Sequence, residues 1–231
     1  MIAFPEIQRK AQAEIDQVIG AGRLPGFQDR RNLPYTDAVV KELLRWHPVA
    51  PMGLPHTTTE DDICDGYLIP KGALLLPNIW CVALSYFPRY FYMLTVGAQR
   101  YFAHDPEVYH EPMVFKPERF LSENGNIPEP DPHKLVFGFG RRICPGRLLA
   151  DSTLYLVIAQ TLAVFNVDKF VENGHELDPA VSFLSGVISH PVPFKTSIRP
   201  RSAQHEELIR SIEKIHLWLE SDANVLESVI Y

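Results

Sequence analysis

The chain has 231 residues, 46% of them hydrophobic, which is enough to bury a sizeable core in one large domain or two small ones. Its formal net charge of -6 at pH 7 argues against a nucleic-acid partner, because such a partner would favour a basic face. Its 20 prolines against 13 glycines favour a loop-rich mixed fold over a helical bundle.

Two helices are predicted near the start of the sequence. The first covers residues 5–19, because this stretch begins with a proline and is followed by glycines, which is the expected asymmetry of a helix. The second covers residues 35–47, where apolar side chains recur at helical spacing. Thr36 or Asp37 is available as its N-cap, and Pro48 is expected to end it.

Three short strands are predicted over residues 62–76, with an Asp-Gly hairpin turn at 65–66 and a proline-led turn at 70–72. An aromatic segment follows at 79–98. It is long enough to span a bilayer, but the proline and arginine at its centre favour a buried or surface-lying segment instead. Residues 104–132 are rich in proline and predict an ordered meander that ends in a surface loop rather than a helix.

The last third of the sequence predicts two helices and a hairpin. Residues 146–165 are apolar on nearly all sides, so this helix is expected to be buried. The hairpin covers residues 181–200 and is expected to turn at Ser185-Gly186, and an amphipathic helix follows from Gln204. The predicted fold is therefore mainly α with small β hairpins, of the α+β class.

The sequence contains three cysteines, Cys64, Cys81 and Cys144, in widely spaced positions. An odd and sparse set predicts neither a disulfide framework nor a zinc site, and favours reduced thiols in a cytosol-facing protein. The first residues show no positively charged segment ahead of an apolar block, so no signal peptide or membrane anchor is expected in them.

Cys144 lies in the glycine-rich, cationic stretch "FGFGRRICPG". Three glycines allow the backbone to turn sharply and to approach a flat ligand closely. The sulfur precedes a helix start, where the helix dipole and the nearby arginines favour a thiolate. Such a thiolate could be a nucleophile, a redox sensor or a single axial ligand to haem iron, whereas zinc would require partner ligands that this spacing does not supply.

The same stretch carries a ten-residue pattern, F-x-x-G-x-R-x-C-x-G, in Phe137, Gly140, Arg142, Cys144 and Gly146. It resembles the haem-binding loop of the cytochrome P450 family, the haem-thiolate monooxygenases. The resemblance implies the C-terminal part of the cytochrome P450 fold, with all five residues in the cofactor-binding loop.

Two further elements agree with this resemblance and lie in the expected order. "KELLR" carries Glu42 and Arg45 at the E-x-x-R spacing of the family, and "FKPERF" carries Arg119. In the family these three side chains form a structural ion-pair cluster behind the haem loop. Glu42 and Arg45 are also (i, i+3) neighbours on one helix face, so the pairing is physically reasonable.

The resemblance implies a role for each site residue. Cys144 would be the catalytic residue and the axial metal ligand of haem b (iron protoporphyrin IX), donating electron density that favours O–O cleavage. Phe137 would pack near the sulfur, and Arg142 would pair with a haem propionate. His56, in "GLPHTT", matches a propionate-binding position. Simple core filling, a solvated arginine and a neutral turn histidine remain the alternatives for these three residues.

The resemblance also implies a substrate pocket and redox partners. Residues 49–55 and 184–188 would line the pocket, and their apolar character suits an apolar small-molecule substrate, which the sequence does not identify. Oxygen and an NADPH-dependent reductase would complete the reaction. A full-length relative would lie on the cytosolic face of the endoplasmic reticulum membrane. Two alternatives stay open: a catalytically inactive haem-binding or interaction fragment, and a thiol-based redox sensor.

The resemblance predicts the following organisation. Residues 1–210 form a partial haem-thiolate monooxygenase domain, and residues 211–231 form a C-terminal helical extension. Residues 81–100 interrupt two matching blocks and are interpreted as an insertion, either genuine or translated from an intron. The family's distal haem face is not recognised in this sequence, so we expect the chain alone to bind haem weakly and its activity to be uncertain.

Overall fold

The computed structural model describes residues 1–51, 53–76, 79, 103–122, 125, 127–179, 181–184 and 186–215. Several sequence predictions lie outside these residues. They are the aromatic segment beyond Ile79, the insertion at 81–100, Cys81, Ser185 and the extension after Ile215. In the described part, the helices and small antiparallel sheets confirm the predicted α+β class.

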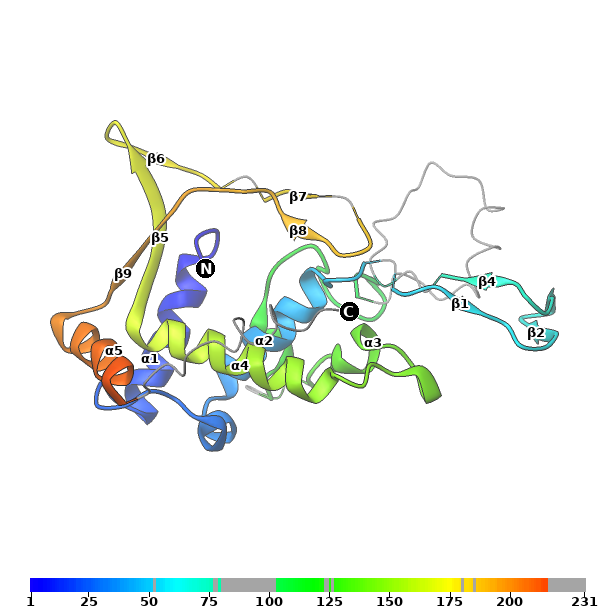
Figure 1. Ribbon diagram of the computed structural model, residues 1–231, viewed down its shortest axis with the longest axis horizontal. Coiled ribbons are helices and arrows are strands. Elements are labelled where there is room, and N and C mark those ends of the chain that lie inside the picture. The colour runs from blue at the N-terminus through cyan, green and yellow to red at the C-terminus, as the bar shows by residue number, and fades with distance from the viewer. Residues whose placement is uncertain are drawn as a thin grey trace, which may run out of the picture.

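A layer of helices forms the body of the molecule (Figure 1). The helices α1 (Pro5–Val18) and α2 (Pro34–Trp46) pack against each other and against α4 (Arg147–Val164), and α5 (Ala203–Ile215) contacts α4. Their shared core consists of buried apolar side chains. These are Ala11, Ile15, Leu33, Val40, Tyr155, Ala159, Leu162, Ala163 and Val164.

The first two predicted helices are confirmed, but the predicted N-cap of α2 is wrong. The helix begins at Pro34, so Thr36 and Asp37 already lie within its first turn. The free backbone N–H groups there are bound by a residue of α1 instead. The Glu14 carboxylate accepts the N–H of Tyr35 at 2.7 Å and the N–H and hydroxyl of Thr36 at 2.8 Å. A tertiary contact thus replaces the local cap.

A β arm extends away from the helices at the right of Figure 1. In it β2 (Asp62–Cys64) pairs with β3 (Tyr67–Ile69), and β1 (His56–Thr57) pairs with β4 (Leu74–Leu75). The turn at residues 65–66 has φ values of 49° and 81°, which are the left-handed values of a tight hairpin. The three predicted strands are confirmed, and β1 is an additional strand that the sequence did not reveal.

A second group of strands lies above the helices in Figure 1. The strand β5 (Phe165–Glu172) pairs with β6 (His175–Leu177) on one side and with β9 (Thr196–Pro200) on the other. A further pair, β7 (Phe183–Leu184) and β8 (His190–Pro191), forms the hairpin predicted within residues 181–200. The sequence analysis missed β5 and β6, which directly follow α4.

In the segment between the β arm and α4, described residues 103–122, 125 and 127–146 form no long helix, in agreement with the meander predicted at residues 104–132. This described part contains short helical turns: η3 (Pro117–Phe120), α3 (His133–Val136) and η4 (Gly140–Arg142). Its buried side chains, such as Tyr109 and Phe120, pack against Ala38 of α2. The meander therefore covers the face of α2 that α1 and α4 leave open.

Helix α4 is present where predicted, but the expectation that it is buried is wrong for its N-terminal half. Leu148 and Leu149 are 72% and 74% exposed. The buried residues lie in the C-terminal half, where α4 contacts α1 and α2. By length and composition α4 could cross a membrane, and 28% of it is buried inside the described structure.

Candidate functional site

The cysteine loop is a tight turn that leads into α4. The N–H of Cys144 donates to the carbonyl oxygen of Phe137 at 2.8 Å and closes the loop. Gly138 and Gly140 have φ values of 78° and 57°, which a residue with a Cβ atom adopts only with strain. The loop thus depends on glycine at both positions, and it delivers the cysteine two residues before the Gly146 N-cap of α4.

The thiol of Cys144 is free and half-buried, and three arginines lie within three residues of it in the sequence. A Cβ atom on Gly146 would lie 3.9 Å from its sulfur, which is an ordinary van der Waals contact. Arg141, Arg142 and Arg147 are exposed, and within the described part of the chain their side chains form no hydrogen bond or ion pair. They and the N-terminus of α4 favour a negative charge at this place.

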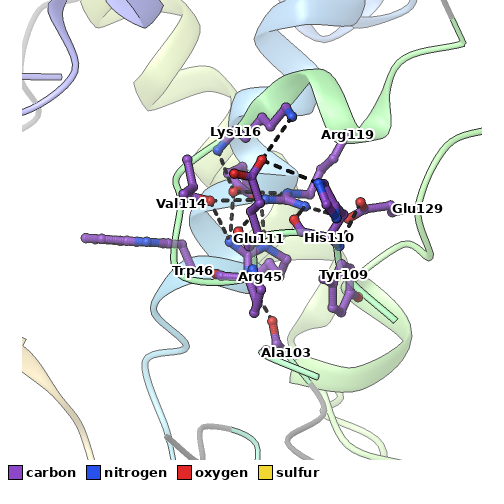
Figure 2. A network of polar contacts seen from close by, with 12 residues as sticks. Arg45, Trp46, Ala103, Tyr109, His110, Glu111, Val114, Lys116, Arg119 and Glu129 are labelled. Atoms are coloured by element: carbon purple, nitrogen blue, oxygen red, sulfur yellow. Dashed lines mark hydrogen bonds and ion pairs between the residues drawn. The ribbon is translucent and has the colours of Figure 1, made fainter. Parts of the chain in front are cut away.

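The residues Glu42, Arg45 and Arg119 meet in a buried network. Figure 2 shows Arg45 and Arg119 within it. The Arg45 guanidinium donates to both carboxylate oxygens of Glu42 at 2.7 and 2.8 Å. The Nε of Arg119 lies 3.2 Å from one Glu42 oxygen, and the Lys116 N–H donates to the other at 2.7 Å. All three charged side chains are at most 1% exposed, so the charges depend on one another for solvation.

The two arginines also fasten the meander to α2. Arg45 donates to the carbonyl oxygens of Ala103 and Pro112 at 2.8 and 2.7 Å. Arg119 donates to the carbonyl oxygen of His110 at 2.6 Å and to the Glu129 carboxylate at 2.7 Å. Figure 2 shows the donors converging from both elements on the chain around residues 110–116. The network therefore fixes irregular backbone that has little regular hydrogen bonding of its own.

A histidine to which the sequence assigned no role lies beside the loop. His133 bridges Asp131, at 2.6 Å from Nδ1, and Asp151, at 2.8 Å from Nε2. Its ring stacks on that of Phe137, with 5.9 Å between the centroids. An Asp-x-His spacing at 131–133 was visible in the sequence, but the second carboxylate lies 18 residues further along the chain.

The protonation of His133 follows from these contacts. Burial acts to lower the pKa of His133, but the hydrogen bonds and charges of Asp131 and Asp151 outweigh it, so the pKa is raised above its ordinary value. Burial acts to raise the pKa of Asp131, but its hydrogen bonds to His133 prevail and lower that pKa to about 2. Both contacts therefore favour the charged pair.

The structure places the predicted cofactor residues on two elements. Phe137, Gly140, Arg142, Cys144 and Gly146 lie together in the cysteine loop. His56 lies on β1, where it pairs with Leu75 of β4, and no hydrogen bond or ion pair joins its side chain to the described loop. Among the described residues, the polar contacts of the Glu42 network do not reach the loop either.

The two segments predicted to line a pocket are brought together. The N–H of Ser189 donates to the carbonyl oxygen of Val49 at 2.8 Å, and the Ser189 hydroxyl lies 2.9 Å from Nε2 of His47. The His47 ring stacks on Phe183 of β7. Apolar side chains of both segments are exposed beside these contacts. They are Val49, Leu54, Leu184, Val187 and Ile188.

The donor set at the loop fits a haem iron. One thiol offers a single soft ligand, which suits a metal whose other positions are filled by a macrocycle. Among the described residues, no group of three or more His, Cys, Asp or Glu side chains could hold a metal ion by protein ligands alone. The left-handed glycines also suit the close approach of a flat ligand.

Comparison with known proteins connects this site to one family. The chain is 53% identical to the cytochrome P450 monooxygenase claR of Ampulloclitocybe clavipes over 227 residues, and 50% identical to the O-methylsterigmatocystin oxidoreductase of Aspergillus flavus over 223 residues. It is 49% identical to cytochrome P450 monooxygenase 208 of Postia placenta over 214 residues. The alignments cover 98%, 96% and 93% of this chain but only 38% of each relative.

The family comparison agrees over most of the chain. The family model described as Cytochrome P450 matches residues 1–89 and 99–198, which include the Glu42 network and the complete cysteine loop. All three relatives above are fungal proteins. On the evidence of this match, the chain belongs to the cytochrome P450 family.

Proposed function

We propose that this chain forms the haem-thiolate part of a monooxygenase, with Cys144 as the axial ligand of haem b (iron protoporphyrin IX). The observation that carries the proposal is the cysteine loop. It presents one free thiol at the start of a long helix, between glycines in left-handed conformation and beside three arginines without side-chain partners in the described structure. When bound, the haem iron would supply the oxygen-activating chemistry.

The residues of the chain would bind and orient this group. Cys144 would be the thiolate, stabilised by the helix start and the positive charges around it. Arg142 would pair with a propionate, because its exposed guanidinium is free to form a charge-assisted hydrogen bond. His56 would bind a propionate from the β arm. The Glu42, Arg45 and Arg119 network would hold the meander that packs behind the loop.

The proposed reaction inserts one oxygen atom of O₂ into an apolar small molecule, with electrons from an NADPH-dependent reductase. Support for an apolar substrate comes from the exposed aliphatic side chains of residues 49–55 and 184–188. Support for the reaction class comes from the relatives, two of which are named monooxygenases and one an oxidoreductase. We further propose the cytosolic face of the endoplasmic reticulum membrane as the location.

The test is haem binding by the expressed chain, read from the spectrum of its ferrous–CO complex. We expect weak haem binding, because the chain lacks a recognised distal haem face, and the red-shifted band of a thiolate ligand from the haem that is bound. The Cys144→Ala variant should retain the fold and lose this band. If wild type and variant gave the same spectrum, Cys144 would not be the ligand and the proposal would fail.

A second candidate is a haem-binding or interaction protein without turnover. It is favoured by the exposure of the first turns of α4, where Leu148 and Leu149 are largely uncovered. The chain spans 38% of the length of the curated relatives it matches. Oxidation of NADPH with a reductase and an added apolar substrate would separate the two candidates, because only the monooxygenase would form a hydroxylated product.

A further inference from the structure

A closed ring of alternating charges lies beside the cysteine loop. It consists of three basic side chains and three aspartates, which come from four elements of the fold and from the turn before one of them. In order around the ring they are Arg30, Asp151, His133, Asp131, Lys41 and Asp37.

The contacts of the ring are short on all but one side. Arg30 donates two hydrogen bonds to Asp151 at 2.6 and 2.8 Å and a third to Asp37 at 2.7 Å. Lys41 lies 3.0 Å from Asp37, and the longest link, 4.0 Å, joins Lys41 to Asp131. A bidentate guanidinium contact fixes orientation as well as distance, so the ring is a defined arrangement.

The ring ties together the elements that surround the loop. Arg30 lies on η1 (Phe27–Asn32), Asp37 and Lys41 on α2, His133 on α3 and Asp151 on α4. The side chains are between 20% and 40% exposed, so water screens them only in part. Figure 1 shows α3 beside the N-terminal half of α4, at the end that carries the cysteine.

One member of the ring contacts the loop itself. The His133 ring stacks on Phe137, at 23° between the ring planes, and the backbone carbonyl of Phe137 accepts the N–H of Cys144. His133, Phe137 and Asp151 also line one open pocket of about 190 Å³, together with Arg147 and Leu148. A path of direct contacts therefore leads from the ring through His133 and Phe137 to Cys144.

We propose that His133 is a positioning residue for Cys144, and that the charge ring makes the loop respond to pH through this histidine. With His133 charged, both aspartates hold its ring against Phe137 and so preserve the backbone hydrogen bond of the cysteine. Once His133 loses its proton, one of its two contacts becomes a hydrogen bond without an ion pair, and the other loses its donor. The stack on Phe137 then loosens, and the loop opens more often.

The direction of this response follows from the groups that face His133. They are Asp131 from the turn before α3, Asp151 and Arg147 from α4, and Lys41 from α2, with the two aspartates in direct contact. Because these aspartates raise the pKa of folded His133, its contribution is complete below the ordinary histidine value of about 6.5 and declines as pH rises through the raised value. The loop should therefore be held more firmly at pH 6 than at pH 9.

The test is amide hydrogen exchange by NMR on the haem-free full chain. The readout is the protection factor of the Cys144 N–H, corrected for intrinsic exchange at each pH. We expect it to fall about tenfold between pH 6 and pH 9. The N–H of Ile19, bonded to Ile15 at 2.8 Å in α1, should keep its protection and serves as the internal control.

Two variants assign the effect to His133. His133→Phe retains an aromatic ring but removes the charge, so Cys144 protection should be low at both pH values. His133→Arg keeps a charge that does not titrate, so protection should be high at both. The proposal would be overturned if, in the wild-type chain, the protection factor of the Cys144 N–H were as independent of pH as that of the Ile19 N–H. This outcome needs no variant, so it can be observed even if a variant fails to fold.

This inference rests on the proposed function only in treating Cys144 as the residue to be positioned. The exchange measurement needs no haem, so a chain that failed to bind haem could still show the predicted response. Conversely, a haem-loaded chain with the thiolate spectrum and no pH-dependent protection would uphold the proposed function and reject the positioning role.

Discussion

Glu42 lies between two buried arginines and is fully shielded from water. Removal of one partner from a buried charge network leaves the remaining charges without compensation, and this typically costs about 3–5 kcal/mol of unfolding free energy. We expect the Glu42→Gln variant, which keeps the shape of the side chain, to lose that amount. Urea denaturation followed by circular dichroism measures the loss.

The matched control is an exposed pair of similar chemistry. Glu206 and Arg210 form an (i, i+4) ion pair on α5, with side chains 49% and 68% exposed. Exposed helical pairs contribute about 0.3–0.5 kcal/mol, so Glu206→Gln should change stability only slightly. Equal losses in the two variants would mean that burial of the Glu42 network does not determine its contribution.

At the scale of elements, Glu14 of α1 takes the place of a local cap for α2. Its carboxylate accepts three hydrogen bonds from Tyr35 and Thr36. Loss of a capping side chain typically costs about 0.5–2 kcal/mol, and we expect this loss for Glu14→Ala. Thermal unfolding should show it, whereas Gln17→Ala, an exposed change on the same helix, should leave the melting temperature unaltered.

The cysteine loop depends on backbone conformation at Gly138. Its φ of 78° is left-handed, while a Cβ atom there would meet only the Arg142 carbonyl oxygen, at an ordinary 3.9 Å. Strain alone should therefore make Gly138→Ala about 1–2 kcal/mol less stable and lower haem uptake. The control is Gly22→Ala, at a position without left-handed φ and with open space around it. A Gly138 variant with wild-type haem uptake would contradict this account of the loop.

The elements that the sequence predicted well are those with local signals. The Asp-Gly turn at 65–66 and the start of α1 at Pro5 needed only neighbouring residues. The cap of α2 could not be predicted, because its carboxylate comes from 21 residues upstream. The turn between β5 and β6 is different, since Asn173-Gly174 is a local hairpin signal, with φ values of 52° and 80°, that the sequence analysis overlooked.

In the candidate site too, the features visible in the sequence differ from those that only long-range contacts create. The spacing of Glu42, Arg45 and Arg119 could be read from the sequence by resemblance, and the structure places them in contact. Periodicity alone could not reveal the partners of His133, because Asp151 reaches it from another helix. Long-range contacts of this kind leave no pattern in a single sequence, so the charge ring became visible only in the fold.

At the scale of the whole molecule, an apolar sequence did not ensure burial. Residues 147–164 read as a core helix, yet only the part that contacts α1 and α2 is buried. Burial depends on what covers each turn, and composition does not contain that information. The exposed turns are those beside Cys144, so the apolar face and the candidate haem site occupy the same end of α4.

This exposure makes a prediction about solution behaviour. Because Leu148 and Leu149 are 72% and 74% exposed, replacing both by glutamine should change unfolding free energy by no more than about 0.5 kcal/mol. It should nevertheless reduce self-association of the chain, since exposed apolar side chains favour contacts between molecules. Sedimentation velocity measures association, and urea unfolding measures stability.

The control, Leu162→Gln, changes a side chain only 1% exposed in the same helix and should destabilise the fold severely. If the double variant were as unstable as the control, the N-terminal half of α4 would be packed in solution, and the exposed face beside the cysteine would not exist.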